Sequence, residues 1–166
     1  VGSILAKYCK AFGLKIISYD PNKIINDPDI EQVKTLDKLL QNSDIISVNV
    51  SGIEKNNNLI SENEFKQMKD GAILINTSRG NIINIDSLIN NLKNNKIAAA
   101  GLDVIINEHL FPNRYPKKLQ KDLLTLQKQN KLFITPHIGG STIEARVKRF
   151  KFVLESFKRD LAIENN

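Results

Sequence analysis

Residues 71–104 read GAILINTSRGNIINIDSLINNLKNNKIAAAGLDV, and this stretch decides the fold class. An apolar run at 72–75 is followed by a segment with helical spacing at 86–94 and by a run of small residues at 98–104. Strands that are apolar throughout are typical of a parallel sheet whose two faces are both covered. A helix is the usual connection between two such strands. The stretch therefore predicts an α/β fold with a parallel sheet.

The same alternation of strands and helices continues on both sides of this stretch. Further strands are expected at 14–18, 44–48 and 132–135, and further helices at 3–12, 36–41, 61–68 and 143–161. The segment 109–131 is expected to be a long, basic, polar loop. In doubly wound sheets, ligands bind at the carboxyl ends of the strands. The residues that follow the strands are therefore the candidates for function.

The composition is that of one ordinary domain, with 166 residues of which 41% are hydrophobic and 25% charged. No apolar run approaches the roughly 20 residues that a membrane-spanning helix needs. A single cysteine, Cys9, excludes an internal disulfide and a cysteine-cluster metal site. We therefore expect a cytoplasmic protein with no metal and no membrane partner.

The net charge of +6 comes mainly from the C-terminal part of the chain. Either a nucleic-acid surface or a solvated helix face explains the basic run there, whose members are Arg146, Lys148, Arg149, Lys151, Lys158 and Arg159. Acidic residues interrupt this run, and no aromatic platform or nucleic-acid motif accompanies it. These observations favour the solvated face, so no nucleic-acid partner is expected.

Arg79, Asp103 and His137 each lie at or just after the end of a predicted strand. The planar guanidinium of an arginine suits a carboxylate, and histidine is the usual proton donor and acceptor near neutral pH. Gly139 and Gly140 follow the histidine and allow a ligand to approach closely. Each residue also has a structural alternative, namely a helix-capping arginine, a loop-anchoring aspartate and a buried, satisfied imidazole. Their presence at neighbouring strand ends favours one shared functional site.

Gly2 and Asp20 form a weaker candidate for dinucleotide binding. Gly2 opens the first helix, whose N-terminus attracts a pyrophosphate, and Asp20 follows the next strand, where an acid accepts ribose hydroxyls. A packing glycine and a turn aspartate before Pro21 remain an equally good interpretation of the pair taken alone.

Three segments together resemble one family. Residues 71–104, the sequence ITPHIGGST at 134–142 and the sequence AFGLKIISYDP at 11–21 are similar to the NAD-dependent D-2-hydroxyacid dehydrogenases. The form HIGGST is similar to the phosphoglycerate dehydrogenase branch. The resemblance implies a Rossmann-like doubly wound parallel sheet that binds NAD. It also implies hydride transfer between NAD and a small 2-hydroxy or 2-keto acid of the 3-phosphoglycerate, glyoxylate/hydroxypyruvate or D-lactate class.

The resemblance further implies roles for single residues. Arg79 would hold the substrate carboxylate, His137 would exchange a proton with the substrate oxygen, and Glu108 would orient the imidazole. The cofactor would be held by a larger set: Val1, Gly2, Asp20, Val50, Thr77, Ser78, Arg79, Asp103, His137, Gly139 and Gly140. Within that set, Asp103 would hold the nicotinamide amide.

The sequence departs from the family pattern in several places. Residues 49–51 read Asn-Val-Ser where the family usually has His-Val-Pro, and His109 stands where a proline usually follows the glutamate. The longer segment 109–131 leaves the direction of the Glu108 carboxylate open. Residue 1 falls inside the glycine-rich fingerprint, so the central strand of the sheet and the substrate domain are expected to be absent. We therefore expect residues 1–166 to be a fragment of an NAD-binding domain with unpaired strand edges, inactive by itself.

Three functional interpretations stay open at this point. The first is a dehydrogenase that forms a homodimer as a full-length protein. The second is an NAD(H)-sensing module similar to the corepressors of the same family, which also keep the three catalytic residues. The third is an inactive gene fragment.

Overall fold

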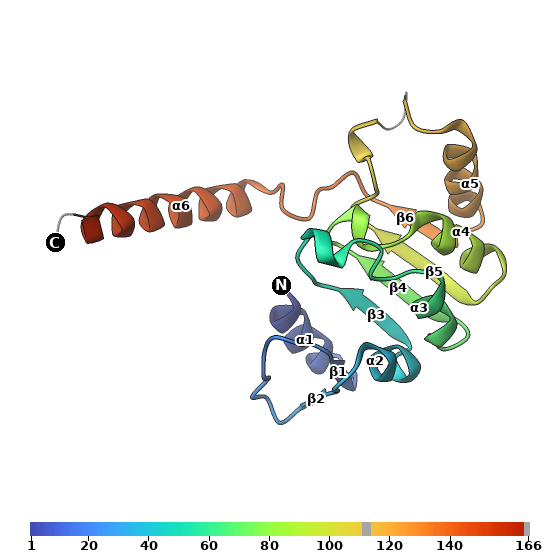
Figure 1. Cartoon of the computed structure of the whole chain (residues 1–166), viewed down its shortest axis with the longest axis horizontal. Coiled ribbons are helices and arrows are strands. Elements are labelled where there is room, and N and C mark those ends of the chain that lie inside the picture. Colours follow the sequence, from blue (N-terminus) through green and yellow to red (C-terminus); the bar gives the residue numbers. More distant parts are fainter. Residues whose placement is uncertain (111–113, 165–166) are drawn as a thin grey trace.

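The computed structural model describes residues 1–110 and 114–164, with side chains described through Lys158 (Figure 1). The strands are β1 (Ile16–Ser18), β2 (Ile30–Gln32), β3 (Ile45–Val48), β4 (Ala72–Asn76), β5 (Ile97–Leu102) and β6 (Leu132–Ile134). The helices are α1 (Gly2–Ala11), α2 (Leu36–Asn42), α3 (Glu62–Gln67), α4 (Ile85–Lys93), α5 (Lys117–Lys128) and α6 (Ile143–Glu164). Short 3₁₀ turns are η1 (Glu54–Asn56), η2 (Gly80–Ile82) and η3 (Glu108–Leu110).

The centre of the molecule is a parallel sheet in the order β3-β4-β5-β6. Helices α2, α3, α4 and α5 form a row in which each packs against the next, and α4 and α5 also pack on β5 and β6 (Figure 1). The core consists of fully buried side chains from these helices and strands, including Leu40, Phe65, Leu74, Leu88, Leu92, Ile97, Leu123, Leu126 and Leu132. The predicted α/β fold with a parallel sheet is confirmed.

Side chains cap the first turns of helices α2 and α3. The Thr35 hydroxyl accepts a hydrogen bond from the Lys38 backbone N–H at the start of α2. At the start of α3, Ser61 and Glu64 form the capping box that the sequence predicts, in which the Ser61 backbone N–H donates to the Glu64 carboxylate over 2.9 Å. Such caps satisfy backbone groups that the helix itself leaves unpaired.

The second face of the sheet is less covered than predicted. Burial alternates along β4, where Ala72, Leu74 and Asn76 are buried but the isoleucines between them are only partly buried. On the edge strands, Ile45 is 51% exposed and Phe133 is 61% exposed. The apolar strands led us to expect cover on both faces. In the described residues the second face is only partly buried, whereas the packed row of helices lies on the face that carries the fully buried side chains.

The strands β1 and β2 form a separate, two-stranded parallel sheet. Within the described residues, β1 pairs with β2 alone and β3 pairs with β4 alone, so each presents one unpaired edge. The unpaired strand edges that the sequence predicts are therefore present in the described residues. Helix α1 has no buried residue, although apolar side chains share one of its faces.

Helix α6 extends away from the rest of the molecule (Figure 1). Its apolar side chains through Phe157 are exposed. The basic residues on α6 through Lys158 are solvated as expected, but its apolar face has no partner in the described structure. No helix within residues 1–110 and 114–164 is both long and apolar enough to cross a membrane.

Two elements were not predicted from the sequence. Strand β2 has the sequence Ile-Glu-Gln, and two of its three residues are polar, so it does not form the apolar run by which the other strands were predicted. Helix α5 occupies much of the segment 109–131, which we expected to be a loop. Its buried residues Leu123 and Leu126 lie at helical spacing, with Leu119 one turn before them, but the remaining sequence is mostly polar and basic and resembles a loop.

Candidate active site

Three neighbouring strands bring the candidate residues to one edge of the sheet. Arg79 follows β4, Asp103 follows β5 directly, and His137 comes after β6. Because β4, β5 and β6 are parallel neighbours, their carboxyl ends meet at this edge. The sequence-based expectation of a shared location is confirmed.

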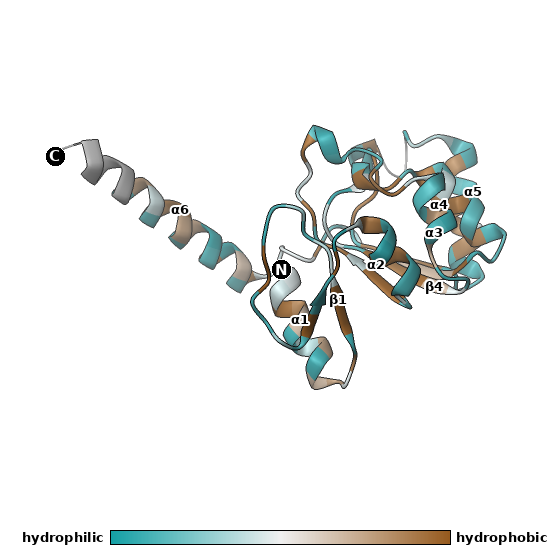
Figure 2. Cartoon of the chain, turned by 60° about the horizontal axis from the view of Figure 1, so that its bottom comes forward, coloured by the Kyte–Doolittle hydropathy of each residue, from teal (hydrophilic) through white to brown (hydrophobic). Residues whose placement is uncertain are grey.

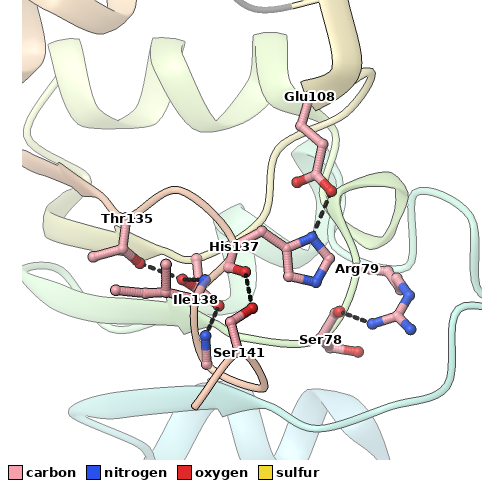
Figure 3. Close-up of polar contacts among 9 residues, drawn as sticks. Ser78, Arg79, Glu108, Thr135, His137, Ile138 and Ser141 are labelled. Atoms are coloured by element: carbon pink, nitrogen blue, oxygen red, sulfur yellow. Dashed lines mark hydrogen bonds and ion pairs between the residues drawn. The ribbon is translucent and has the colours of Figure 1, made fainter. Parts of the chain in front are cut away.

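A short polar contact in the site joins His137 to Glu108. The Nδ1 atom of the imidazole lies 2.6 Å from the Glu108 carboxylate, which η3 directs at the ring (Figure 3). Both side chains are about half exposed, so the pair is open to solvent. The direction of the Glu108 carboxylate, which the sequence left open, is therefore settled in favour of a contact with His137. The other histidine, His109, is exposed as expected.

The backbone of His137 adopts an uncommon conformation. Its φ angle is 53°, in the left-handed region that residues other than glycine seldom occupy. The backbone carbonyl of this residue accepts a hydrogen bond from the Ser141 hydroxyl over 3.3 Å (Figure 3). A strained backbone of this kind persists only where its surroundings hold it.

Asp103 supplies much of that support. Its Oδ1 atom accepts hydrogen bonds from the Thr135 hydroxyl and, over 3.0 Å, from the Ile138 backbone N–H. Its Oδ2 atom accepts from the Gly139 N–H over 2.8 Å. A side chain at position 139 would place its Cβ atom 2.9 Å from the same oxygen, so a glycine is needed for this close approach. Asp103 thus ties the end of β5 to the loop that carries His137.

These contacts also determine the charge state of Asp103. Burial alone raises the pKa of the carboxyl, since only 7% of the residue is exposed. The hydrogen bonds from Thr135, Gly139 and Ile138, together with the nearby His137, outweigh burial and hold the pKa of Asp103 below its ordinary value. The loop is therefore anchored by a carboxylate that is ionised at neutral pH.

The loop after β4 is held by a residue whose importance the sequence analysis missed. Asn76 is 1% exposed, and its side-chain amide donates to the Arg79 carbonyl over 2.9 Å while its oxygen accepts from the Ser78 N–H. An asparagine that ends a strand and bonds the backbone two residues later is the signature of an Asx turn. Thr135, which supports Asp103, was missed in the same way.

Arg79 lies at the rim of a shallow hollow of about 250 Å³, and Glu108 and Gly80 line the same hollow. The guanidinium is exposed, and its Nη1 atom donates to the Ser78 carbonyl over 2.7 Å (Figure 3). Among the described residues, this is the one hydrogen bond given for the Arg79 guanidinium. The arrangement offers a cationic group beside the His137–Glu108 pair, which suits a small anionic ligand.

Some of the residues expected to hold a dinucleotide lie close together in the structure. Ser78 donates a hydrogen bond to the Val50 carbonyl, so the loops after β3 and β4 meet. Gly2 starts α1 beside Asn49, whose Cβ atom would lie 3.5 Å from a side chain at position 2. Asp20 follows β1 and accepts from the Asn22 N–H over 2.9 Å. Thr77 is exposed beside Ser78.

The sequence profile described as D-isomer specific 2-hydroxyacid dehydrogenase, NAD binding domain, matches residues 1–139. The chain belongs to this dehydrogenase family. Among individual relatives, it is 38% identical over 148 residues to D-3-phosphoglycerate dehydrogenase 1 of Saccharomyces cerevisiae, covering 88% of this chain and 32% of that protein. It is 37% identical over 164 residues to hydroxypyruvate reductase of Thermotoga maritima, covering 98% of this chain and 50% of that protein.

Solved structures of this dehydrogenase family have the same fold. D-2-hydroxyisocaproate dehydrogenase superposes with a TM-score of 0.82 at 35% identity, over 93% of this chain and 48% of that one. D-lactate dehydrogenase of Aquifex aeolicus, complexed with NAD and lactic acid, superposes with a TM-score of 0.81 at 31% identity, over 99% of this chain and 53% of that one. The chain thus spans from a third to about half the length of these relatives.

The expected family, its Rossmann-like NAD-binding fold and NAD as its cofactor are confirmed by this membership. The residues present fit a dinucleotide. The N-terminus of α1 at Gly2 suits a pyrophosphate, the carboxylate of Asp20 suits ribose hydroxyls, and exposed polar groups follow the neighbouring strands. No three His, Cys, Asp or Glu side chains lie close enough to hold a metal ion in the part of the chain that is described.

Proposed function

We propose that the protein containing this chain interconverts a D-2-hydroxy acid and the corresponding 2-keto acid with NAD. The observation that carries the proposal is the 2.6 Å contact between His137 and Glu108 at the strand ends beside Arg79. An imidazole held by a carboxylate is a common proton donor and acceptor, and a neighbouring guanidinium binds a carboxylate.

The contact with Glu108 specifies what each nitrogen of the His137 ring does. When Nδ1 carries a hydrogen and donates it to the Glu108 carboxylate, Nε2 is the atom that exchanges a proton. His137 would give that proton to the carbonyl oxygen of a keto acid, or take one from the hydroxyl in the reverse direction. Arg79 would bind the substrate carboxylate and thereby orient the carbonyl.

NAD supplies or accepts the hydride when it is bound. Val1 and Gly2 at the start of α1 would hold its pyrophosphate, and Asp20 would accept hydrogen bonds from the adenosine ribose. The remaining contacts would come from Val50, Thr77, Ser78, Arg79, Asp103, His137, Gly139 and Gly140. Asp103 already accepts three hydrogen bonds from the loop that carries His137, so a contact with the nicotinamide amide would be a further one.

The substrate belongs to the class of small 2-hydroxy acids. The names of the relatives include phosphoglycerate, hydroxypyruvate, glyoxylate and D-lactate enzymes, which share a carboxylate beside the reacting carbon. A homodimer and a cytoplasmic location are part of the same proposal.

The test is a kinetic comparison of two histidine variants in the protein that contains this chain. NADH oxidation is measured with a panel of 2-keto acids, and NADH affinity is measured by fluorescence. His137→Ala should lose turnover by about 10²–10⁴-fold with nearly unchanged NADH affinity. The matched control His109→Ala removes the exposed neighbouring histidine and should keep wild-type turnover.

Full turnover of His137→Ala at saturating substrate would overturn the proposed role of the imidazole. If the wild-type protein binds NADH but turns over no keto acid, the dehydrogenase proposal fails and an NAD(H)-sensing module is supported instead.

A further inference from the structure

Tyr115 is a buried tyrosine to which the proposed mechanism gives no role. It precedes helix α5 by two residues and is 4% exposed. Its hydroxyl donates a hydrogen bond to the backbone carbonyl of Ile106 over 2.9 Å. Buried tyrosine hydroxyls usually find a partner, but this partner lies on the short segment between β5 and Glu108. The contact therefore joins the start of α5 to the loop that carries a residue of the candidate active site.

Helix α5 gives Tyr115 a fixed position. Leu123 and Leu126 of this helix are buried in the core, and the helix packs against α4 and β6. Figure 2 shows α5 beside α4, with hydrophobic and hydrophilic bands along it. Tyr115 itself belongs to the same cluster of buried side chains. Because side chains in such a core are close-packed, the hydroxyl is a firm point of attachment for another backbone segment.

The peptide unit that Tyr115 holds lies directly before an uncommon backbone conformation. The Ile106 carbonyl belongs to the peptide unit that joins Ile106 to Asn107, and the φ angle of Asn107 is 54°. This is the left-handed region, which asparagine enters more readily than most residues. The orientation of the peptide unit and the φ angle of Asn107 together set the direction in which the chain enters η3. Glu108 is the first residue of η3, so its carboxylate depends on that direction.

Gly80 fixes the same segment from the other side. A side chain at position 80 would collide with the backbone of Ile105 and Ile106, so this backbone lies directly against the loop that carries Arg79. The two isoleucines are therefore held from two directions, by Gly80 after β4 and by Tyr115 before α5. Loss of the Tyr115 hydroxyl would free the Ile106 carbonyl to rotate, while the contact with Gly80 would remain.

Tyr115 is a hydrogen-bond donor at neutral pH. Burial raises the pKa of its hydroxyl, and the carboxylate of Asp86 raises this pKa further. The hydroxyl therefore keeps its proton, and it can donate to a carbonyl oxygen, which only accepts.

We propose that Tyr115 is a positioning residue of the candidate active site. By holding the Ile106 carbonyl, it directs the Glu108 carboxylate at the Nδ1 atom of His137. This inference rests on the proposed function, because the gain in turnover arises through the orientation of the His137 ring. Tyr115 acts through Glu108 and does not itself exchange the proton.

The first test reads the contact between Glu108 and His137 without turnover. In the protein containing this chain, NMR of isotope-labelled histidine shows which ring nitrogen carries the hydrogen at about pH 9, where an ordinary imidazole is neutral. The His137 signals are identified by their loss in His137→Ala. In the wild type the hydrogen should be on Nδ1, because the Glu108 carboxylate accepts it there. In Glu108→Ala the hydrogen should move mainly to Nε2.

Tyr115→Phe should shift the His137 signals most of the way toward those of Glu108→Ala. The change removes only a hydroxyl and keeps the ring in the core, so the melting temperature should fall by only about 2–4 °C. Tyr8→Phe is the matched control, because Tyr8 is 65% exposed on α1. It should leave the His137 signals at their wild-type positions.

The second test is a double-mutant cycle on the turnover of a 2-keto acid with NADH. Tyr115→Phe should lower kcat by about tenfold, less than the roughly 10²-fold of a 1 Å misplacement because the Gly80 contact remains. The affinity for NADH should stay nearly unchanged. In the Glu108→Ala background the same change should alter kcat by less than about twofold, since the carboxylate that Tyr115 positions is gone. A merely structural role of Tyr115 gives the same loss in both backgrounds.

Two outcomes would overturn the inference. The first is a Tyr115→Phe protein whose His137 signals match the wild type, and the second is an equal loss of kcat with and without Glu108. A wild-type protein that turns over no keto acid would instead refute the proposed function. The NMR comparison would still decide in that case whether Tyr115 positions the Glu108 carboxylate.

Discussion

Replacement of Gly80 by alanine should separate the two loops that form the candidate site. A Cβ atom at position 80 would lie 2.1 Å from the carbonyl carbon of Ile105 and 2.4 Å from the nitrogen of Ile106. Both neighbours are backbone atoms, so no side chain can rotate away to make room. An ordinary contact requires at least 3.4 Å, so the backbones must move apart by the difference.

The size of the effect follows from this geometry. Overpacking of a close-packed interior costs about 1–3 kcal/mol, and a backbone clash belongs at the upper end of that range. For a protein of this size, each kcal/mol lowers the melting temperature by about 2–4 °C, so Gly80→Ala should melt roughly 6–12 °C below the wild type. Because Gly80 adjoins Arg79 and Ile106 precedes Glu108 by two residues, a shift near 1 Å should also reduce turnover by about 10²-fold.

The assay compares thermal unfolding and turnover of Gly80→Ala with those of Gly101→Ala in the protein containing this chain. Gly101 is a suitable control because a Cβ atom there meets only Ile75 Cγ1, at 4.0 Å, so the added methyl group fits. Gly101→Ala should therefore stay close to the wild type. If Gly80→Ala also melts and turns over like the wild type, the loops are not in the close contact on which the argument rests.

Three further changes test other parts of the structure. Asp103→Asn should lower the free energy of unfolding by about 1–3 kcal/mol at neutral pH. Because the folded state lowers the pKa of Asp103, its contribution is present above the pKa of the unfolded chain, near 3.9, and is lost as the pH falls through the lower folded value. Urea titrations from neutral to strongly acidic pH should show a weaker acid dependence in Asp103→Asn than in the wild type. Ser61→Ala should cost about 1 kcal/mol in the same titration by breaking the capping box of α3, and an unchanged midpoint would contradict that role. Asp20→Ala should relax a preference for NAD over NADP in kinetic assays, and a wild-type protein that uses both equally would refute the role of Asp20.

The central sheet could be predicted because its strands contain continuous apolar runs, as at residues 72–75. The degree of burial on each face of the sheet could not be predicted, because the same apolar run suits a strand with one fully buried face or two. Helix α5 escaped prediction because its leucines, although Leu119, Leu123 and Leu126 lie at helical spacing, stand in a polar and basic segment that resembles a loop. Their burial depends on the sheet and on α4, which local sequence does not encode.

The location of the site could be predicted from the position of Arg79 and His137 at strand ends, which parallel topology brings together. The contact between Glu108 and His137 could not be derived from spacing. In the structure it occurs with a left-handed backbone at His137 and a 3₁₀ turn at Glu108, neither of which the sequence analysis predicted. The resemblance to the family supplied the pair, and the structure supplies the reason that the two side chains meet.

For Asp103, the family resemblance and the structure indicate two different roles. The resemblance implies a role toward the nicotinamide, whereas the structure shows three hydrogen bonds to the loop that carries His137. An ionised carboxylate offers about four acceptor positions, so one remains and the two roles are compatible. The anchoring contacts join protein atoms only, so loss of Asp103 should disturb the loop that carries His137. Any effect of its removal on NAD affinity therefore includes this structural part.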